Sequence, residues 1–106
     1  MAKRYYNKLV RDKVPDAIVS GGDKAVTTVL DSHDAFLAAL DEKLDEELVE
    51  YQMSKSLSEL ADVLEVVYAI AESKGSSIEE LNAIRLEKRE KRGGFSRKIL
   101  LKEIIE

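Results

Sequence analysis

Apolar residues recur at helical spacing through the middle of this chain. Between positions 32 and 52, leucines and one tyrosine follow each other at steps of three or four residues: Leu37, Leu40, Leu44, Leu48 and Tyr51. This spacing places them on one face of a helix. The pattern predicts a helix that begins after Asp31 or Ser32 and ends near Gln52.

The next segment, about 57–74, is apolar on two sides. Its first face comprises Leu57, Leu60, Ala61, Leu64, Val67, Tyr68 and Ala71, and its second face comprises Val63, Val66 and Ile70. A helix that is apolar on two sides is buried on two sides, which a domain this small cannot easily achieve alone. We therefore predict an all-α antiparallel helical hairpin bundle that is completed by dimerisation.

Shorter elements flank this predicted hairpin. Pro15 suits the first turn of a short helix in "VPDAIVSGG" (14–22), and Ser77 and Glu80 have capping-box spacing at the start of a third helix, about 78–91. The β-branched segment 24–30 is expected to form a short two-stranded pair with 97–102. A final helical turn fits the region 97–104 equally well.

Length and composition restrict the class of protein. The 106 residues suit a single domain, 1–106, and the absence of cysteine excludes disulfides and thiolate metal sites. The opening "MAKRYYNK" lacks the apolar region of a secretory signal, and no apolar run approaches the roughly 18 residues that span a bilayer. We expect a cytoplasmic protein without a membrane partner.

Charge is unevenly distributed along the chain. The net charge is −4, yet segments 3–13 and 85–98 are basic whereas 41–65 is strongly acidic. The basic ends either attract the acidic centre or supply an anion site beside a metal site. A pI near 5.1 and the acidic centre argue against binding to a nucleic acid duplex.

Four carboxylates are expected to face one another across the hairpin. Glu47 and Glu50 are three residues apart on the first long helix, as are Glu59 and Asp62 on the second. With a short antiparallel connection, Glu50 lies level with Glu59, and Glu47 with Asp62. Glu46 points nearly opposite to the apolar stripe and is the acid expected to be most solvated.

A divalent cation would remove the repulsion within such a square. Because the ligands are all oxygen, Mg²⁺ or Mn²⁺ is favoured over Zn²⁺. The alternative is a solvated helix face: Ser56 and Glu59 also have capping-box spacing, and Glu50 could pair with Lys43 or Lys55. Spacing alone leaves both interpretations open.

Three segments resemble one enzyme family. Glu46-Glu47-Leu-Val-Glu50 followed by Glu59-Leu-Ala-Asp62 resembles the EExxE…ExxD signature of MazG-type nucleotide pyrophosphohydrolases, in the all-α NTP pyrophosphatase superfamily. The segments "YNKLVRDKVP" (6–15) and "EKREKRGGF" (87–95) resemble a subgroup described as phosphoribosyl-ATP pyrophosphohydrolase-like. The eight residues between Glu50 and Glu59 make a tighter connection than the MazG pattern has.

The resemblance implies a Mg²⁺-dependent enzyme that cleaves the α–β phosphate bond of a nucleoside triphosphate, releasing a monophosphate and pyrophosphate. Members assemble as dimers or dimers of dimers. The metal-binding, catalytic role falls on five acids: Glu46, Glu47, Glu50, Glu59 and Asp62. The pyrophosphate leaving group needs positive charge, for which the candidates are Lys8, Arg11, Lys88, Lys91 and Arg92, each of which could instead form a surface ion pair.

Two other functions remain open at this stage. The chain could be a non-catalytic helical dimerisation or regulatory module, although such a module needs no concentration of acids. It could also be a phosphoribosyl-ATP pyrophosphohydrolase of histidine synthesis.

Overall fold

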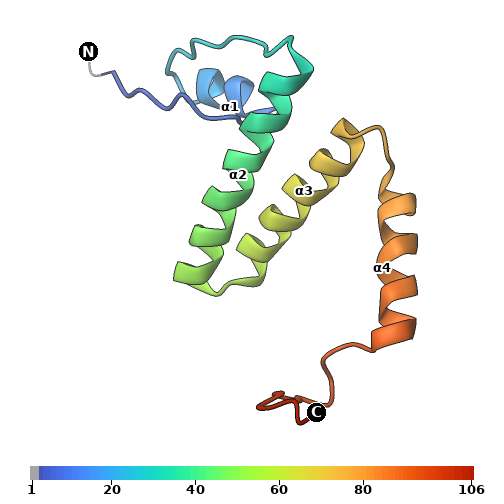
Figure 1. The fold of residues 1–106 in the computed structure, drawn as a ribbon. Coiled ribbons are helices and arrows are strands. Elements are labelled where there is room, and N and C mark those ends of the chain that lie inside the picture. Colours follow the sequence, from blue (N-terminus) through green and yellow to red (C-terminus); the bar gives the residue numbers. More distant parts are fainter. Residues whose placement is uncertain (1–2) are drawn as a thin grey trace.

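The computed structural model describes residues 3–106 and contains four helices over that range (Figure 1). In chain order they are α1 (Val14–Ser20), α2 (His33–Ser54), α3 (Leu57–Ser73) and α4 (Ile78–Arg92). The all-helical prediction is confirmed. The expected strand pair of 24–30 with 97–102 is wrong, because residues 3–106 contain no strand, and 97–104 forms no helical turn either.

Helices α2 and α3 pack as the predicted antiparallel hairpin, joined only by Lys55 and Ser56. Lys55 adopts a left-handed conformation, with φ of 56°, and its N–H bonds to the carbonyl of Tyr51. The starts of both helices are fixed by serines, since Ser32 Oγ accepts from Ala35 N–H and Ser56 Oγ accepts from Glu59 N–H. These local bonds explain why the predicted boundaries agree closely with those observed.

The hydrophobic core is small. Its buried apolar residues are Leu40 of α2 with Val66 and Ala71 of α3. Val66 belongs to the second apolar face of α3, so this face packs toward α2. The first face stays largely uncovered, because Leu57 is 82% exposed and Leu60 and Leu64 are also exposed. The hairpin therefore packs the second face, together with Ala71 at the end of the first, and leaves the Leu57–Leu64 part of the first face exposed.

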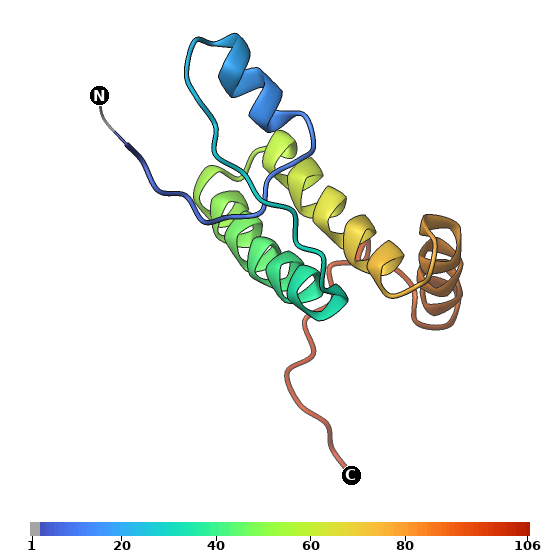
Figure 2. The same ribbon diagram turned by 90° about the horizontal axis from the view of Figure 1, so that it is seen from above.

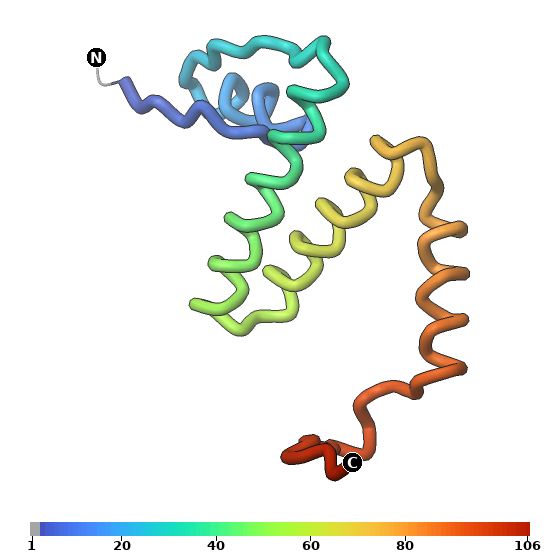
Figure 3. The backbone as a smooth tube through the Cα atoms, in the orientation of Figure 1, coloured from blue at the N-terminus to red at the C-terminus, as the bar shows by residue number. Residues whose placement is uncertain are grey.

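The turn after α3 is a Schellman motif built around Gly75, whose φ is 82°. Gly75 N–H bonds to the Glu72 carbonyl and Ser76 N–H to the Ala71 carbonyl, both at 3.0 Å. Beyond this turn α4 diverges from α3, and within residues 3–106 it contacts no other helix (Figure 3). Residues 93–106 follow α4 as an arm without helix or strand.

The N-terminal segment and the link between α1 and α2 both cross the hairpin (Figure 2). Ion pairs from Lys8 to Glu46 and from Arg11 to Asp62 hold the first crossing against α2 and α3. This crossing brings the basic start of the chain to its acidic centre.

The chain is open for its size. Its radius of gyration is 18.5 Å, against about 13 Å for a compact domain of this length. Its accessible surface is 9840 Å², whereas a compact monomer of 11.9 kDa exposes about 5,900 Å². Within residues 3–106, no helix is both long enough and apolar enough to cross a membrane.

Candidate metal centre

Three of the four carboxylates predicted to face one another converge between α2 and α3. Glu47 and Glu50 of α2 and Glu59 of α3 each place one oxygen so that all three oxygens lie within 4.8 Å of one another. The i, i+3 spacing puts the first two on one side of α2, and the two-residue connection brings the first turn of α3 level with them. We call these three residues the carboxylate cluster.

Two oxygens of the cluster are buried without a partner. Glu47 is only 7% exposed, and Glu47 Oε2 and Glu59 Oε2 find no hydrogen-bond partner in the part of the chain that the structure describes. Buried carboxylate oxygens normally have a donor or a cation beside them, because their desolvation is otherwise costly. The cluster therefore has unused capacity to bind a positively charged group.

The ionisation of Glu47 reflects this environment. Burial raises the pKa of Glu47 above its usual value of 4.5, and the neighbouring side chain of Glu50, with its negative charge, raises it further. Lys43 acts in the opposite direction. The pKa of Glu47 is raised on balance, so ionisation of this side chain is disfavoured in the protein without a bound cation.

The capping alternative for Glu59 is realised only in part. Ser56 Oγ accepts from Glu59 N–H at 3.1 Å, but Ser56 N–H donates to Ser54 Oγ at 3.2 Å rather than to the Glu59 carboxylate. At the start of α4, by contrast, the Glu80 carboxylate does turn back and accepts from Ser76 Oγ at 2.9 Å. Ser56 thus caps the helix by accepting from the Glu59 backbone, while the Glu59 side chain joins the cluster.

Lys43 is the basic residue nearest to the cluster, and its partners differ from those expected. Its Nζ lies 3.4 Å from both Glu46 Oε1 and Glu47 Oε1, and the side chain is 20% exposed. Glu50 makes no ion pair with any of residues 3–106, so the alternative pairing with Lys43 or Lys55 is not formed. The residues that Lys43 does pair with, Glu46 and Glu47, follow it by three and four positions. This helical spacing could have predicted both ion pairs.

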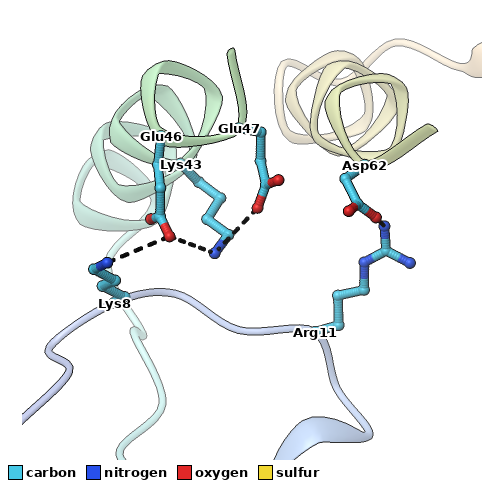
Figure 4. A network of polar contacts seen from close by, with 6 residues as sticks. All are labelled: Lys8, Arg11, Lys43, Glu46, Glu47 and Asp62. Atoms are coloured by element: carbon cyan, nitrogen blue, oxygen red, sulfur yellow. Dashed lines mark hydrogen bonds and ion pairs between the residues drawn. The ribbon is translucent and has the colours of Figure 1, made fainter. Parts of the chain in front are cut away.

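The two other predicted acids contact the N-terminal segment (Figure 4). Arg11 Nη2 donates to Asp62 Oδ1 at 2.7 Å, and Lys8 Nζ donates to Glu46 Oε1 at 3.4 Å. Asp62 is thus held outside the carboxylate cluster by an arginine. Glu46 is partly covered, because Lys43 and Lys8 lie on either side of its carboxylate.

A surface cavity of about 330 Å³ adjoins the Arg11–Asp62 pair. Arg11 and Asp62 form its polar edge, and Leu64 and Tyr68 of α3 contribute apolar surface. Its position on the first apolar face of α3 follows from the helical spacing of Ala61, Leu64 and Tyr68. The sequence placed Tyr68 on this face without identifying it as part of a cavity.

The remaining predicted phosphate ligands lie elsewhere in the chain. Lys88, Lys91 and Arg92 of α4 line a separate hollow of about 200 Å³, with Ile84 and Glu87. Lys91 Nζ pairs with Glu87 Oε1 at 3.0 Å, and α4 makes no helix contact with α2. One copy of the chain does not bring these residues to the carboxylate cluster.

The carboxylate cluster fits a hard divalent cation. It offers oxygen ligands only, and two of its oxygens are buried and unpartnered. Mg²⁺ and Mn²⁺ prefer such ligands and often retain water in the remaining positions. Of the three side chains, that of Glu50 is exposed to solvent.

No protein-family model matches this chain, and no curated protein or solved structure matches it significantly. The resemblance to MazG-type pyrophosphohydrolases therefore rests on the sequence motifs alone, and membership of that family remains a prediction.

Proposed function

We propose that this protein is a Mg²⁺-dependent nucleotide pyrophosphohydrolase that cleaves the α–β phosphate bond of a nucleoside triphosphate or related nucleotide. The observation that carries the proposal is the carboxylate cluster, in which three acids converge and two buried oxygens lack a partner. A purely solvated helix face would keep such oxygens in water. The sequence motifs supply the reaction class.

In this proposal Glu47, Glu50 and Glu59 hold the metal, with Glu46 and Asp62 at the edges of the site. When bound, Mg²⁺ would neutralise phosphate oxygens and lower the pKa of a coordinated water. The chain's own carboxylates would orient the attacking water and accept hydrogen bonds from it. Burial of Glu47 keeps part of this site out of bulk solvent.

The N-terminal segment would supply positive charge to the phosphates. Arg11 and Lys8 already lie beside the acids, and both side chains are more than half exposed, so they can turn to an incoming anion. Arginine is well suited to this role because its guanidinium can form two parallel bonds with a phosphate. The nucleoside would occupy the cavity between Arg11 and Tyr68, whose 330 Å³ is at the lower end of typical ligand sites.

Self-association is the second part of the proposal. The uncovered first face of α3 and the large accessible surface favour a homodimer or a dimer of dimers. In such an assembly Lys88, Lys91 and Arg92 would reach the acids of a neighbouring copy. This arrangement accounts for basic residues that one chain keeps away from the cluster.

The test is to incubate the purified protein with each NTP and dNTP, and with phosphoribosyl-ATP, in Mg²⁺ or in EDTA. Products are identified by ³¹P NMR. We expect monophosphate and pyrophosphate only with Mg²⁺, and no turnover by Glu59→Gln, while Glu72→Gln on the exposed side of α3 stays active. Release of orthophosphate and diphosphate would contradict α–β cleavage.

A helical dimerisation module is the competing function, favoured by the extent of uncovered apolar surface. The module and the enzyme differ in their dependence on the cluster. A module without metal would become slightly more stable when Glu50 and Glu59 are replaced by glutamine, and would show no Mg²⁺ binding by calorimetry.

A further inference from the structure

The arm formed by residues 93–106 carries apolar side chains that cover nothing in their own chain. Their exposed fractions run from 70% to 97%, in Phe95, Ile99, Leu100, Leu101, Ile104 and Ile105. Isolated exposed apolar residues are common, but six within eleven positions are not. A cluster of exposed apolar side chains of this size normally marks a surface that another surface covers.

The first face of α3 is an uncovered surface of matching character. Leu57, Leu60 and Leu64 are exposed and follow helical spacing, so they form one apolar stripe. Glu65, which lines the adjoining cavity and makes no ion pair with any of residues 3–106, gives the border of the stripe a negative charge. The arm is basic where it begins, at Arg97 and Lys98. The two surfaces are thus complementary in both hydrophobicity and charge.

The fold keeps the arm away from α3 of the same chain. Both hydrogen bonds of the Schellman motif fix the turn at Gly75, and α4 leaves it at an angle to α3 (Figure 1). The fifteen residues of α4 span about 22 Å before the arm begins. The arm consequently starts well to the side of the hairpin.

The accessible surface area of the chain indicates that a second copy of the chain covers part of it. The chain exposes 9840 Å², about 3,900 Å² more than a compact monomer of its mass. A standard protein interface needs about 800 Å² from each partner, and extensive homodimers need more. The excess is sufficient for an intertwined pair of identical chains.

We propose that the arm of one copy packs on the part of the first face of α3 around Leu57 and Leu60 of a second copy, beside the cavity, so that two chains exchange their C-terminal segments. Arg97 and Lys98 of each arm then lie beside the acidic border of the other copy's cavity. The site in one chain is completed by basic residues from its partner. This inference rests on the proposed self-association but not on the proposed hydrolysis.

Cysteine cross-linking tests the exchange directly, because the natural chain contains no cysteine. A Leu60→Cys chain is mixed with a Leu100→Cys chain and treated with a short bis-maleimide, which tolerates small differences in register. We expect a covalent heterodimer on a denaturing gel. The matched control pairs Lys74→Cys, at the exposed turn before α4, with Leu100→Cys and should give little product.

The double variant Leu60→Cys, Leu100→Cys distinguishes exchange from folding back. A cross-link within single chains, with no interchain product, would overturn the proposal. Absence of any Leu60–Leu100 product from a dimeric protein would overturn it as well, since the arm would then lie elsewhere.

A second measurement uses light scattering after chromatography. We expect Leu100→Asp to weaken dimerisation at least about tenfold, because a buried unpaired charge is costly. Lys102→Asp, a charge change in the same arm, should leave the dimer largely intact. Circular dichroism reports whether the helices persist, and an undiminished Leu100→Asp dimer would contradict the exchange. Neither experiment uses metal or nucleotide, so its outcome is independent of the enzymatic proposal.

Discussion

Arg11 Nη2 donates to Asp62 Oδ1 at 2.7 Å, a contact between residues 51 positions apart that joins the N-terminal segment to α3. Arg11 is 58% exposed and Asp62 39%, so the pair contributes little to stability. Its main effect is local, since it neutralises the acid that the motif assigns to the metal. In the proposed site, Arg11 and a metal ion compete for Asp62.

Replacing Arg11 with glutamine should therefore have opposite effects on metal binding and on nucleotide binding. Without the guanidinium we expect Mg²⁺ to bind up to about fivefold more tightly, corresponding to the roughly 0.2–1 kcal/mol of an exposed ion pair. The KM for the nucleotide should rise, because a phosphate ligand is lost. Calorimetry with Mg²⁺ alone and steady-state kinetics measure the two effects.

Lys13→Gln is the matched control for Arg11→Gln, since Lys13 is exposed on the same segment and makes no ion pair with any of residues 3–106. It removes one positive charge and should change neither quantity appreciably. Equal effects of the two substitutions would show that only net charge matters.

Glu59→Gln should reduce Mg²⁺ affinity by at least about tenfold, or about 1.4 kcal/mol, while the fold is retained. The amide keeps the size of the side chain and removes one of three converging charges, so apo stability should stay equal or rise. Glu72→Gln on the same helix controls for general charge effects. Mn²⁺ titration followed by electron paramagnetic resonance measures the affinity, and unchanged Mn²⁺ binding would exclude Glu59 as a ligand.

The raised pKa of Glu47 predicts a characteristic dependence of stability on pH. The unfolded chain titrates near the usual 4.5, whereas the folded chain binds the proton more tightly. Protonation therefore favours the fold, and the destabilisation by ionised Glu47 grows as pH rises from 4.5 through the raised pKa. In the metal-free protein the penalty is therefore larger at neutral pH than near pH 4.5.

Glu47→Gln should accordingly melt at a higher temperature than the natural protein at pH 7 in EDTA. The difference should shrink as the pH is lowered toward 4.5, because protonation makes the natural side chain increasingly neutral. Excess Mg²⁺ should reverse the order at pH 7, because only the natural carboxylate binds the ion fully. Glu65→Gln serves as an exposed control. If the difference in melting temperature between Glu47→Gln and the natural protein does not change with pH, burial does not raise the pKa of Glu47.

The sequence was most informative where structure depends on near neighbours. Ser32, Ser56 and Ser77 mark three helix starts because each hydroxyl accepts a backbone N–H three residues ahead. The convergence of Glu50 and Glu59 was equally predictable, since a two-residue connection leaves little freedom in the hairpin register. Both features follow from local geometry.

Features that depend on distant segments were not predictable in the same way. Asp62 has the right position for a square of carboxylates, but the path of the N-terminal segment brings Arg11 to it instead. The segment 24–30 has strand-forming residues, yet it crosses the hairpin as extended chain without a partner strand. A segment rich in β-branched residues is able to form a strand. Its tertiary contacts decide whether the strand forms.

The cap of α3 links helix stability to the proposed site, and this link can be measured. Ser56 Oγ accepts from Glu59 N–H at 3.1 Å, so the same bond starts the helix and anchors the backbone of a cluster residue.

Ser56→Ala should reduce the free energy of unfolding by about 1 kcal/mol, as loss of a helix cap usually does. It should also weaken Mg²⁺ binding severalfold, because the first turn of α3 frays and Glu59 with it. Ser58→Ala, at an exposed position two residues after Ser56, removes a hydroxyl without a capping role and should alter neither property. Urea unfolding and Mg²⁺ calorimetry on the three proteins decide the matter: a loss of stability with undiminished metal affinity would show that Glu59 does not require its cap to bind.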